Sequence, residues 1–402
     1  MFQSEILRVC EGYLDLLPTV DNRYKLVKDI GVSRFGKVYM AVDMQKGELV
    51  AIKSLIHWRQ NLTHLQMFLN EMLNLTKIQK MGRASRVCSL LAFNFHGRYR
   101  NGKPIVYFVM EFKEMGDLLS LVDTMDQNLS TKLVGFFHHQ ICLAIRDIQG
   151  ANIAHLDLKP DNIVIDDQLN LFLCDFGHSL DVSKPMLLRS KKQKKISASQ
   201  IEKLSSRSFV GSMQYCAPEV HEFQNELDET EPDPEIVSQS IKQINFFKCD
   251  VFGAGVVMFV QLHKTFPFNK AHIQDLHFLT MIQKPQIYWK SIQCIRIMDQ
   301  DFRDYFYQTC ETQNAKRASI KDVLAHHWIQ DNRFHFAEEA REEMKEWIKS
   351  KKQAFIQDLL ERFKDQRRDR KVGFFVFFYF YGFCVINSIK KRNIVEKKIS
   401  KI

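Results

Sequence analysis

The stretch that decides the fold is HLDLKPDNIVI at residues 155–165, followed by CDFGHS at residues 174–179. The first run places Asp157, Lys159 and Asn162 in one loop ahead of a strand, and in the second Asp175 follows an apolar segment. Such a set supplies a proton acceptor for a hydroxyl group, a cation for a phosphate and oxygen ligands for a divalent cation. The pattern therefore suits phosphoryl transfer.

Two upstream runs add groups that phosphate chemistry needs. The run IGVSRFGKV lies between two predicted strands, and small residues there let a hairpin backbone approach a polyphosphate. Its small residues are Gly31, Ser33 and Gly36. The run VAIK ends at Lys53 inside an apolar strand, where an unpaired charge is costly, so we expect a partner acid. Glu71 on the following helix is the best candidate, and the alternative is a Lys53 exposed at a strand edge.

The order of predicted elements indicates a two-lobed α+β architecture. Strand-like runs begin at Tyr24, a helix is expected over residues 64–79, and later signals are mostly helical. We expect a small β-rich lobe at about residues 24–112 and a larger α-helical lobe at about residues 113–328. A helical lead-in is expected over residues 1–23.

These runs together resemble the eukaryotic protein kinase family. Its signature elements are a Gly-rich loop, V-A-I-K, a helical Glu, H-R-D-x-x-x-x-N, D-F-G and A-P-E. All six occur here in that order, the last as Cys216-Ala217-Pro218-Glu219. The resemblance covers about residues 24–328 and implies the two-lobed protein kinase fold, with ATP and Mg²⁺ as cofactors.

The resemblance also implies a role for each matching residue. Asp157 would be the catalytic base, Lys159 would contact the γ-phosphate, and Lys53, paired with Glu71, would hold the α- and β-phosphates. The residues implied for nucleotide binding are Ile30, Gly31, Ser33, Gly36, Val38, Ala51, Lys53, Met110, Glu111, Lys113, Asp117, Asn162 and Asp175. The implied Mg²⁺ ligands are Asn162 and Asp175.

Two further acids have structural roles by the same resemblance. Asp250, in CDVFGAG, corresponds to a buried acid that anchors the catalytic loop. Glu219 is expected to pair with Arg317. Neither acid is expected to touch the substrate.

The acceptor class follows from the same motifs. Lys159 and the run GSMQYCAPE resemble serine/threonine kinases, and HLDLKP with the final HHWI is most similar to the calcium/calmodulin-dependent branch. We expect transfer of the ATP γ-phosphate to Ser/Thr hydroxyls of a protein substrate, and no nucleic acid partner. Ser33 replaces a glycine, and Leu156 replaces the Arg of H-R-D, as in a non-RD kinase. Because leucine cannot pair with a phosphorylated residue, we expect activity that does not depend on that phosphate switch.

Two alternatives come from other functional classes. The chain is a pseudokinase if it binds nucleotide as a regulatory or scaffolding module without catalysis. It is a membrane-tethered adaptor if its function resides in the tail. The presence of all the catalytic residues favours the active enzyme.

Composition places the chain among globular proteins, with 45% hydrophobic and 26% charged residues. The net charge of +10 is concentrated at the end, because 18 basic and 11 acidic residues occur from Asp331 onward. The nine cysteines include no C-x-x-C pair and fit neither a disulfide framework nor a zinc site. We expect a cytoplasmic protein.

Two stretches have the composition of exposed, poorly ordered loops. Residues 184–208 are basic and serine-rich, and residues 222–238 are acidic. The lysine cluster at Lys191–Lys195 has three interpretations: docking of an acidic partner, a nuclear signal, or a solvated loop.

Residues 329–371 form a charged tail, predicted to be a long helix from Ala337 because no Gly or Pro interrupts it. Its apolar residues among lysines hint at a calmodulin target or an autoinhibitory helix, but acids on the basic face disfavour calmodulin. Residues 372–402 are a Phe-rich segment with a basic end. A helix of 15 residues spans only about 22 Å of a membrane core of about 30 Å, although residues 372–389 reach a marginal span. A membrane contact, packing against the kinase body and a fortuitous extension remain open.

Overall fold

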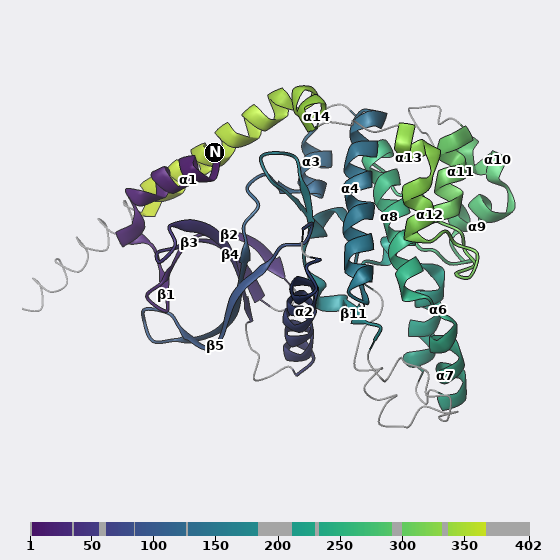
Figure 1. The fold of residues 1–402 in the computed structure, drawn as a ribbon, viewed down its shortest axis with the longest axis horizontal. Helices are drawn as coiled ribbons and strands as arrows, with labels where there is room; N and C mark the ends of the chain where they lie inside the picture. The colour runs from purple at the N-terminus through teal and green to yellow at the C-terminus, as the bar shows by residue number, and fades with distance from the viewer. Residues whose placement is uncertain are drawn as a thin grey trace, which may run out of the picture.

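The computed structural model describes residues 2–33, 36–55, 62–83, 85–125, 128–183, 211–229, 233–291, 300–331 and 337–366. Within these ranges the chain forms a β-sheet lobe and a helical lobe (Figure 1). The predicted two-lobed α+β fold is confirmed. The segments 184–208 and 372–389, which carry the interpretations of a basic loop and a membrane contact, lie outside the described residues.

The small lobe is a six-stranded antiparallel sheet in the order β1–β2–β3–β4–β6–β5. Its strands are β1 (Thr19–Val20), β2 (Tyr24–Ser33), β3 (Gly36–Asp43), β4 (Glu48–Leu55), β5 (Leu90–Arg98) and β6 (Pro104–Glu111). Strands β4 and β6 carry nearly continuous apolar runs because both of their faces are covered. On one face lies the main core, to which α2 (Leu62–Lys80) contributes Phe68, and on the other lies a cluster around Tyr24 and Tyr107.

The lead-in differs from the helix predicted over residues 1–23. α1 covers Phe2–Glu11, a single 3₁₀ turn covers Leu14–Leu16, and β1 then joins the sheet edge. Gly12 and Pro18 interrupt the helical pattern, because glycine is a weak helix former and proline lacks a backbone donor. The apolar face of α1 is buried through Phe2, Ile6 and Cys10.

The large lobe is built around α4 (Thr131–Gly150) and α8 (Phe246–His263). α8 is long and apolar enough to cross a membrane, but 83% of it is buried among its neighbours, so it is the core helix of this lobe. The other helices here are α3 (Leu118–Thr124), α6 (Pro218–Leu227), α7 (Pro234–Gln243), α9 (Leu276–Gln283), α10 (Pro285–Ser291), α11 (Gln300–Thr309), α12 (Ile320–Ala325) and α13 (His327–Asp331).

Most of the acidic stretch at residues 222–238 is helical, which differs from the loop that its composition predicted; residues 230–232 lie outside the described residues. α6 continues to Leu227, and α7 begins after Asp233, whose side chain accepts a hydrogen bond from the backbone N–H of Glu235. Its buried apolar residues are Phe223, Leu227 and Val237. These anchors outweigh the acidic composition, because burying an apolar side chain stabilises helix packing by about 1.5–3 kcal/mol.

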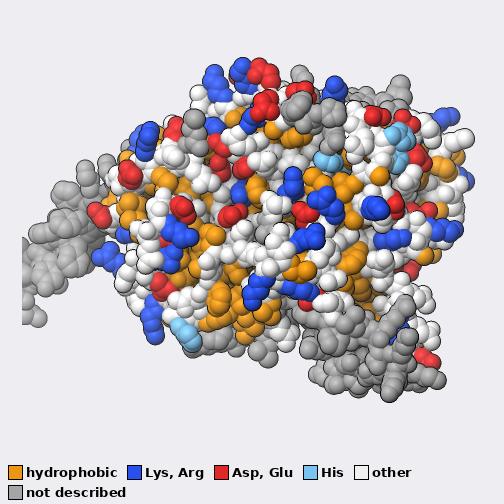
Figure 2. Space-filling view, viewed as in Figure 1, with side chains coloured by type: hydrophobic (Ala, Val, Ile, Leu, Met, Phe, Trp, Pro, Cys, Tyr) orange, Lys and Arg blue, Asp and Glu red, His pale blue; other side chains and the backbone are white. Residues whose placement is uncertain are grey.

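The charged tail forms α14 (Ala337–Glu343), a turn at Met344 and a second helical segment over residues 345–366, which we name the tail helix. Basic and acidic side chains alternate along the upper edge of the molecule, over α14 (Figure 2). On the inner face Met344, Leu359 and Phe363 are buried in the main core. The tail is therefore amphipathic and packs on the body of the protein.

Candidate active site

The β2–β3 hairpin and strand β4 bring the predicted phosphate-binding groups together. In the sheet register Gly31 pairs with Val38, and Val38 pairs in turn with Lys53. A register shift between Asp29 and Gly31 marks a bulge, which bends the hairpin locally. Lys53 is only 2% exposed, so the alternative of an exposed strand-edge lysine is wrong.

Lys53 forms two ion pairs in the interior. Its Nζ donates to Glu71 Oε2 at 2.7 Å and to Asp175 Oδ1 at 2.9 Å. Burial raises the pKa of Glu71 to about 7, although the Lys53 ammonium opposes this rise. Burial also acts to raise the pKa of Asp175, but Lys53 and the Gly177 N–H outweigh it and lower that pKa to about 2. The expected pair of Lys53 with Glu71 is present, and Asp175 is ionised at neutral pH.

Asp250, on α8, holds the backbone of the catalytic loop. Its Oδ2 accepts from His155 N and its Oδ1 from Leu156 N, both at 2.8 Å. Leu156 has a φ of 63°, a region that is costly for a bulky side chain, so these two bonds hold a strained turn. Burial raises the pKa of Asp250 to about 7, and the two N–H groups oppose the rise. The side chain of Leu156 is apolar and buried, so this position has no cation that could bind a phosphate.

Asp157 is oriented by groups from two loops. Its Oδ1 accepts from Ser212 N at 2.7 Å, and its Oδ2 accepts from Asn162 Nδ2 at 3.0 Å. Lys159 Nζ lies 3.7 Å from the same Oδ2. A Cβ atom at Gly211 would lie 2.3 Å from Asp157 Oδ1, so only glycine fits there in this arrangement. The protein itself therefore holds the carboxylate in one orientation.

One cleft of about 860 Å³ is formed by residues of both lobes, and it is lined by Lys53, Asp157 and Asp175. The volume falls within the range of small-molecule sites, about 300–1,000 Å³. The predicted site residues that line it are Ile30, Gly31, Val38, Ala51, Lys53, Glu71, Met110, Glu111, Lys113, Asp117, Asp157, Lys159, Asn162 and Asp175. Ser33 and Gly36 stand at the end of the β2–β3 hairpin, beside residues 34–35, which are not described.

The residues after β6 connect the two lobes. Met110 is buried and pairs with Ala51 across β4 and β6, which makes an apolar wall suited to a flat aromatic base. Lys113 Nζ lies 3.1 Å from Glu111 Oε2, so these two side chains pair with each other. The backbone of Glu111 and Lys113 then remains as the polar surface that could bond an aromatic base. Asp117 caps α3, where its Oδ1 accepts the backbone N–H three residues further along at 2.7 Å.

Asn162 and Asp175 line the same cleft and suit Mg²⁺, which prefers oxygen ligands. Asp175 is ionised, and Asn162 uses its amide nitrogen to bond Asp157, which leaves the amide oxygen as the ligand atom. Within the described ranges no group of three or more His, Cys, Asp or Glu residues is placed to hold a metal. Mg²⁺ at these two residues would therefore complete its coordination shell with water and phosphate oxygens.

The cleft also contains residues that the sequence analysis did not assign to it. Among them are Lys28, Cys88, Cys174, Ser212, Lys351, Ala354, Phe355, Asp358 and Arg362. Cys174 carried a signal, since it directly precedes Asp175. The apolar residues of the tail helix indicated a docking surface, but their place at this cleft depends on how the tail folds back.

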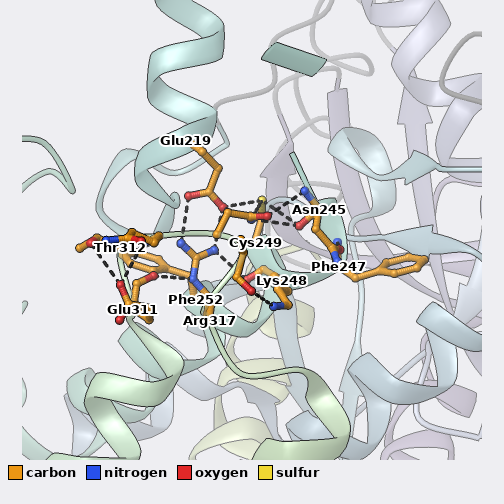
Figure 3. Close-up of polar contacts among 12 residues, drawn as sticks. Glu219, Asn245, Phe247, Lys248, Cys249, Phe252, Glu311, Thr312 and Arg317 are labelled. Carbon is orange, nitrogen blue, oxygen red and sulfur yellow. Dashed lines mark hydrogen bonds and ion pairs between the residues drawn. The ribbon is translucent and has the colours of Figure 1, made fainter. Parts of the chain in front are cut away.

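Outside the cleft, Glu219 and Arg317 form the expected ion pair (Figure 3). Arg317 Nη1 donates to Glu219 Oε1 at 2.7 Å, and Nη2 donates to Oε2 at 2.9 Å. Arg317 also donates to the backbone oxygens of Glu311 at 2.8 Å and Lys248 at 3.0 Å. The pair thus connects the start of α6 to the residues before α12.

Comparison with known proteins agrees with this geometry. The family described as Protein kinase domain matches residues 24–329. The chain is 25% identical over 315 residues to CBL-interacting protein kinase 11 of Oryza sativa subsp. japonica, covering 76% of this chain and 51% of that protein. It is 26% identical over 315 residues to Serine/threonine-protein kinase D2 of Homo sapiens, covering 77% of this chain and 30% of that protein.

The chain spans about half or less of the length of these relatives. The matching region covers the two lobes and most of the cleft lining, but not the tail-helix residues that also line the cleft. Since the family match extends over roughly three quarters of the sequence, the chain belongs to the protein kinase domain family.

Proposed function

We infer that this chain is an active serine/threonine protein kinase that uses ATP and Mg²⁺. The observation that carries the inference is the convergence, in one cleft, of the Lys53–Glu71–Asp175 ion pairs with the oriented Asp157 carboxylate. Phosphoryl transfer depends chiefly on positioning and electrostatic stabilisation, and this set supplies both. The name of one relative, Serine/threonine-protein kinase D2, supports the acceptor class.

The geometry supports a proposed role for each of these residues. Asp157 accepts the proton of the substrate hydroxyl, and its hydrogen bonds from Ser212 and Asn162 hold it in place for this. Lys159, near the same carboxylate, contacts the phosphate being transferred. Lys53 keeps its positive charge because Asp175 and Glu71 surround it, so it holds the other phosphates. When bound by Asn162 and Asp175, Mg²⁺ neutralises charge on the phosphate oxygens.

Leu156 bears on how activity is controlled. Its buried apolar side chain stands in the catalytic loop at the position where, by the family resemblance, an arginine would pair with a phosphorylated residue. The chain lacks that charge-assisted pair, so its activity does not need that particular phosphate.

The test is transfer of labelled phosphate from ATP to a generic basic protein, using the full chain with Mg²⁺. Asp157→Asn should reduce the rate by about 10²–10⁴-fold, because the proton acceptor is lost. Asp228→Asn is the matched control, since Asp228 is an exposed acid that contacts Gln224 on α6. Label on serine or threonine supports the proposal, whereas label on tyrosine contradicts the acceptor class. If a nucleotide analogue raises the melting temperature but no transfer occurs, the chain is a nucleotide-binding pseudokinase.

A further inference from the structure

The tail helix, residues 345–366, runs across both lobes with α1 beside it (Figure 1). On the large lobe, Trp347 Nε1 donates to Thr124 Oγ1 at 3.2 Å. One turn further along, Lys352 Nζ lies 3.4 Å from Asp167 Oδ2. The first half of the tail helix is therefore attached to the lobe that carries the catalytic loop.

The second half is attached to the small lobe and to the connection between the lobes. Asp358 Oδ2 lies 2.8 Å from Lys28 Nζ on β2, and this Nζ also lies 4.7 Å from the centre of the Phe355 ring. The centre of the Phe355 ring lies 5.8 Å from that of Phe2 on α1. It lies 6.4 Å from the ring centre of Phe112, the residue directly after β6. Phe355 thus lies where α1, β2 and the connection between the lobes meet.

The tail helix is anchored in the core as well as at its surface. Leu359 and Phe363 are fully buried, and the Phe363 ring stacks on Tyr13 with 4.3 Å between ring centres. Buried apolar anchors of this kind separate only when the surrounding core opens. The helix is therefore a packed part of the body, which can transmit a constraint from one lobe to the other.

The tail helix also contributes to the wall of the nucleotide cleft. Its residues that line the cleft are Lys351, Ala354, Phe355, Asp358 and Arg362. The cleft retains about 860 Å³ with these side chains in place. The helix therefore forms a side wall of the cleft and does not fill it.

A nucleotide in this cleft contacts both lobes, so its affinity depends on the spacing between them. If the lobes move freely, binding must first order them, and this cost weakens the complex. A helix attached to both lobes restricts that motion before the nucleotide arrives. Affinity should then depend on residues of the tail helix that face the small lobe.

We propose that the tail helix is an intramolecular brace that holds the lobes at the spacing required for nucleotide binding. Lys28, Phe355 and Asp358 are its positioning residues, because they connect the helix to the small lobe. This inference rests on the proposed function, since it requires a nucleotide in the cleft. It assigns to the charged tail a role in support of catalysis.

The experiment reverses the charges of the Lys28–Asp358 pair in the full chain. Asp358→Lys sets a new cation beside Lys28 and Arg362, both of which now contact Asp358. Affinity for the non-hydrolysable analogue AMP-PNP with Mg²⁺ is measured by calorimetry, and the KM for ATP by the transfer assay. Each single variant, Asp358→Lys or Lys28→Asp, should weaken AMP-PNP binding by about fivefold or more. The KM for ATP should rise more than kcat falls.

Two further variants make this result specific. The double exchange Lys28→Asp with Asp358→Lys should recover part of the affinity, because the attraction is restored with opposite signs. Glu361→Lys makes the same charge change at an exposed position of the tail helix, where Glu361 accepts a hydrogen bond from Gln357. It should bind AMP-PNP as the parent does.

Equal affinity in the parent and the single variants would overturn the brace. Tighter binding in the single variants would also overturn it, since the helix would then obstruct the cleft. If the parent itself binds no AMP-PNP, the proposed function fails, and the brace is judged by amide hydrogen exchange without nucleotide. Protection of residues 345–366 that falls in Asp358→Lys supports attachment to the lobes, whereas exchange at free-peptide rates in the parent rules it out.

Discussion

The Glu219–Arg317 pair offers a sharp test of how the large lobe is held together. Arg317 is 1% exposed, and its guanidinium makes a two-bond contact with the Glu219 carboxylate (Figure 3). Glu219→Gln keeps the shape of the side chain but removes the negative charge. It also turns an amide N–H₂ toward one of the guanidinium N–H groups, so at least one hydrogen bond is lost.

The expected loss of stability is large because the Arg317 guanidinium would remain buried without an opposite charge beside it. Arginine stays protonated, and its bonds to the backbone oxygens of Glu311 and Lys248 do not neutralise it. Breaking a buried ion pair by removal of one partner costs about 3–5 kcal/mol. We therefore expect Glu219→Gln to lower the free energy of unfolding of the large lobe by that amount. The double variant Glu219→Gln with Arg317→Met should lose less than Glu219→Gln alone, because the uncompensated charge is gone.

The assay is urea unfolding followed by tryptophan fluorescence, to which Trp289 and Trp328 of the large lobe contribute two of the four tryptophans. Glu222→Gln, an exposed change one turn further along α6, should alter stability by no more than about 0.5 kcal/mol. Burial acts to raise the pKa of Glu219, but Arg317 outweighs it and lowers this pKa below its ordinary value of 4.5. The stabilisation is therefore present above pH 4.5 and is lost as the pH falls, so the parent and Glu219→Gln should converge in acid. A loss below about 1 kcal/mol at neutral pH would refute this account.

Two further predictions concern the cleft. Lys53→Met should reduce phosphate transfer by about 10²–10³-fold, because the cation that bonds Asp175 and Glu71 is removed; unchanged transfer with labelled ATP would contradict its role. Asp250→Asn should lower the free energy of unfolding by about 1–3 kcal/mol, because the amide retains one acceptor oxygen for two N–H donors. It should also lower kcat more than it raises the KM for ATP, since the strained Leu156 turn is part of the catalytic loop; a change in KM alone would show that the loop is unaffected.

Much of the site was predictable because its chemistry is encoded in short runs. Asp157, Lys159 and Asn162 stand within six residues of each other, so their loop brings them together whatever the rest of the chain does. The partner of Lys53 was predictable for a different reason, because a charge inside an apolar strand requires an opposite charge nearby. The two-lobed order of elements followed from the change in periodicity along the chain.

Two other predictions, one from composition and one from the spacing of apolar residues, were wrong. The acidic residues 222–238 were expected to be a loop, yet α6 and α7 form because Phe223, Leu227 and Val237 are buried. The helix predicted over residues 1–23 ends at Glu11, because Gly12 and Pro18 interrupt it and Thr19–Val20 pairs with β2. In the acidic stretch the burial of apolar residues outweighed the composition, whereas the lead-in helix ended for a local reason.

The sequence by itself thus determined the family, the lobe order and the residues of the catalytic motifs, since contiguous residues carry their own local geometry. Only the tertiary structure decided which residues from distant parts of the sequence contact those motifs. Gly211 and Ser212 close on Asp157, and the tail helix joins the wall of the cleft. Each of these contacts joins segments more than 50 residues apart in the chain. Their meeting depends on how whole faces of helices and sheets pack, which no local pattern specifies.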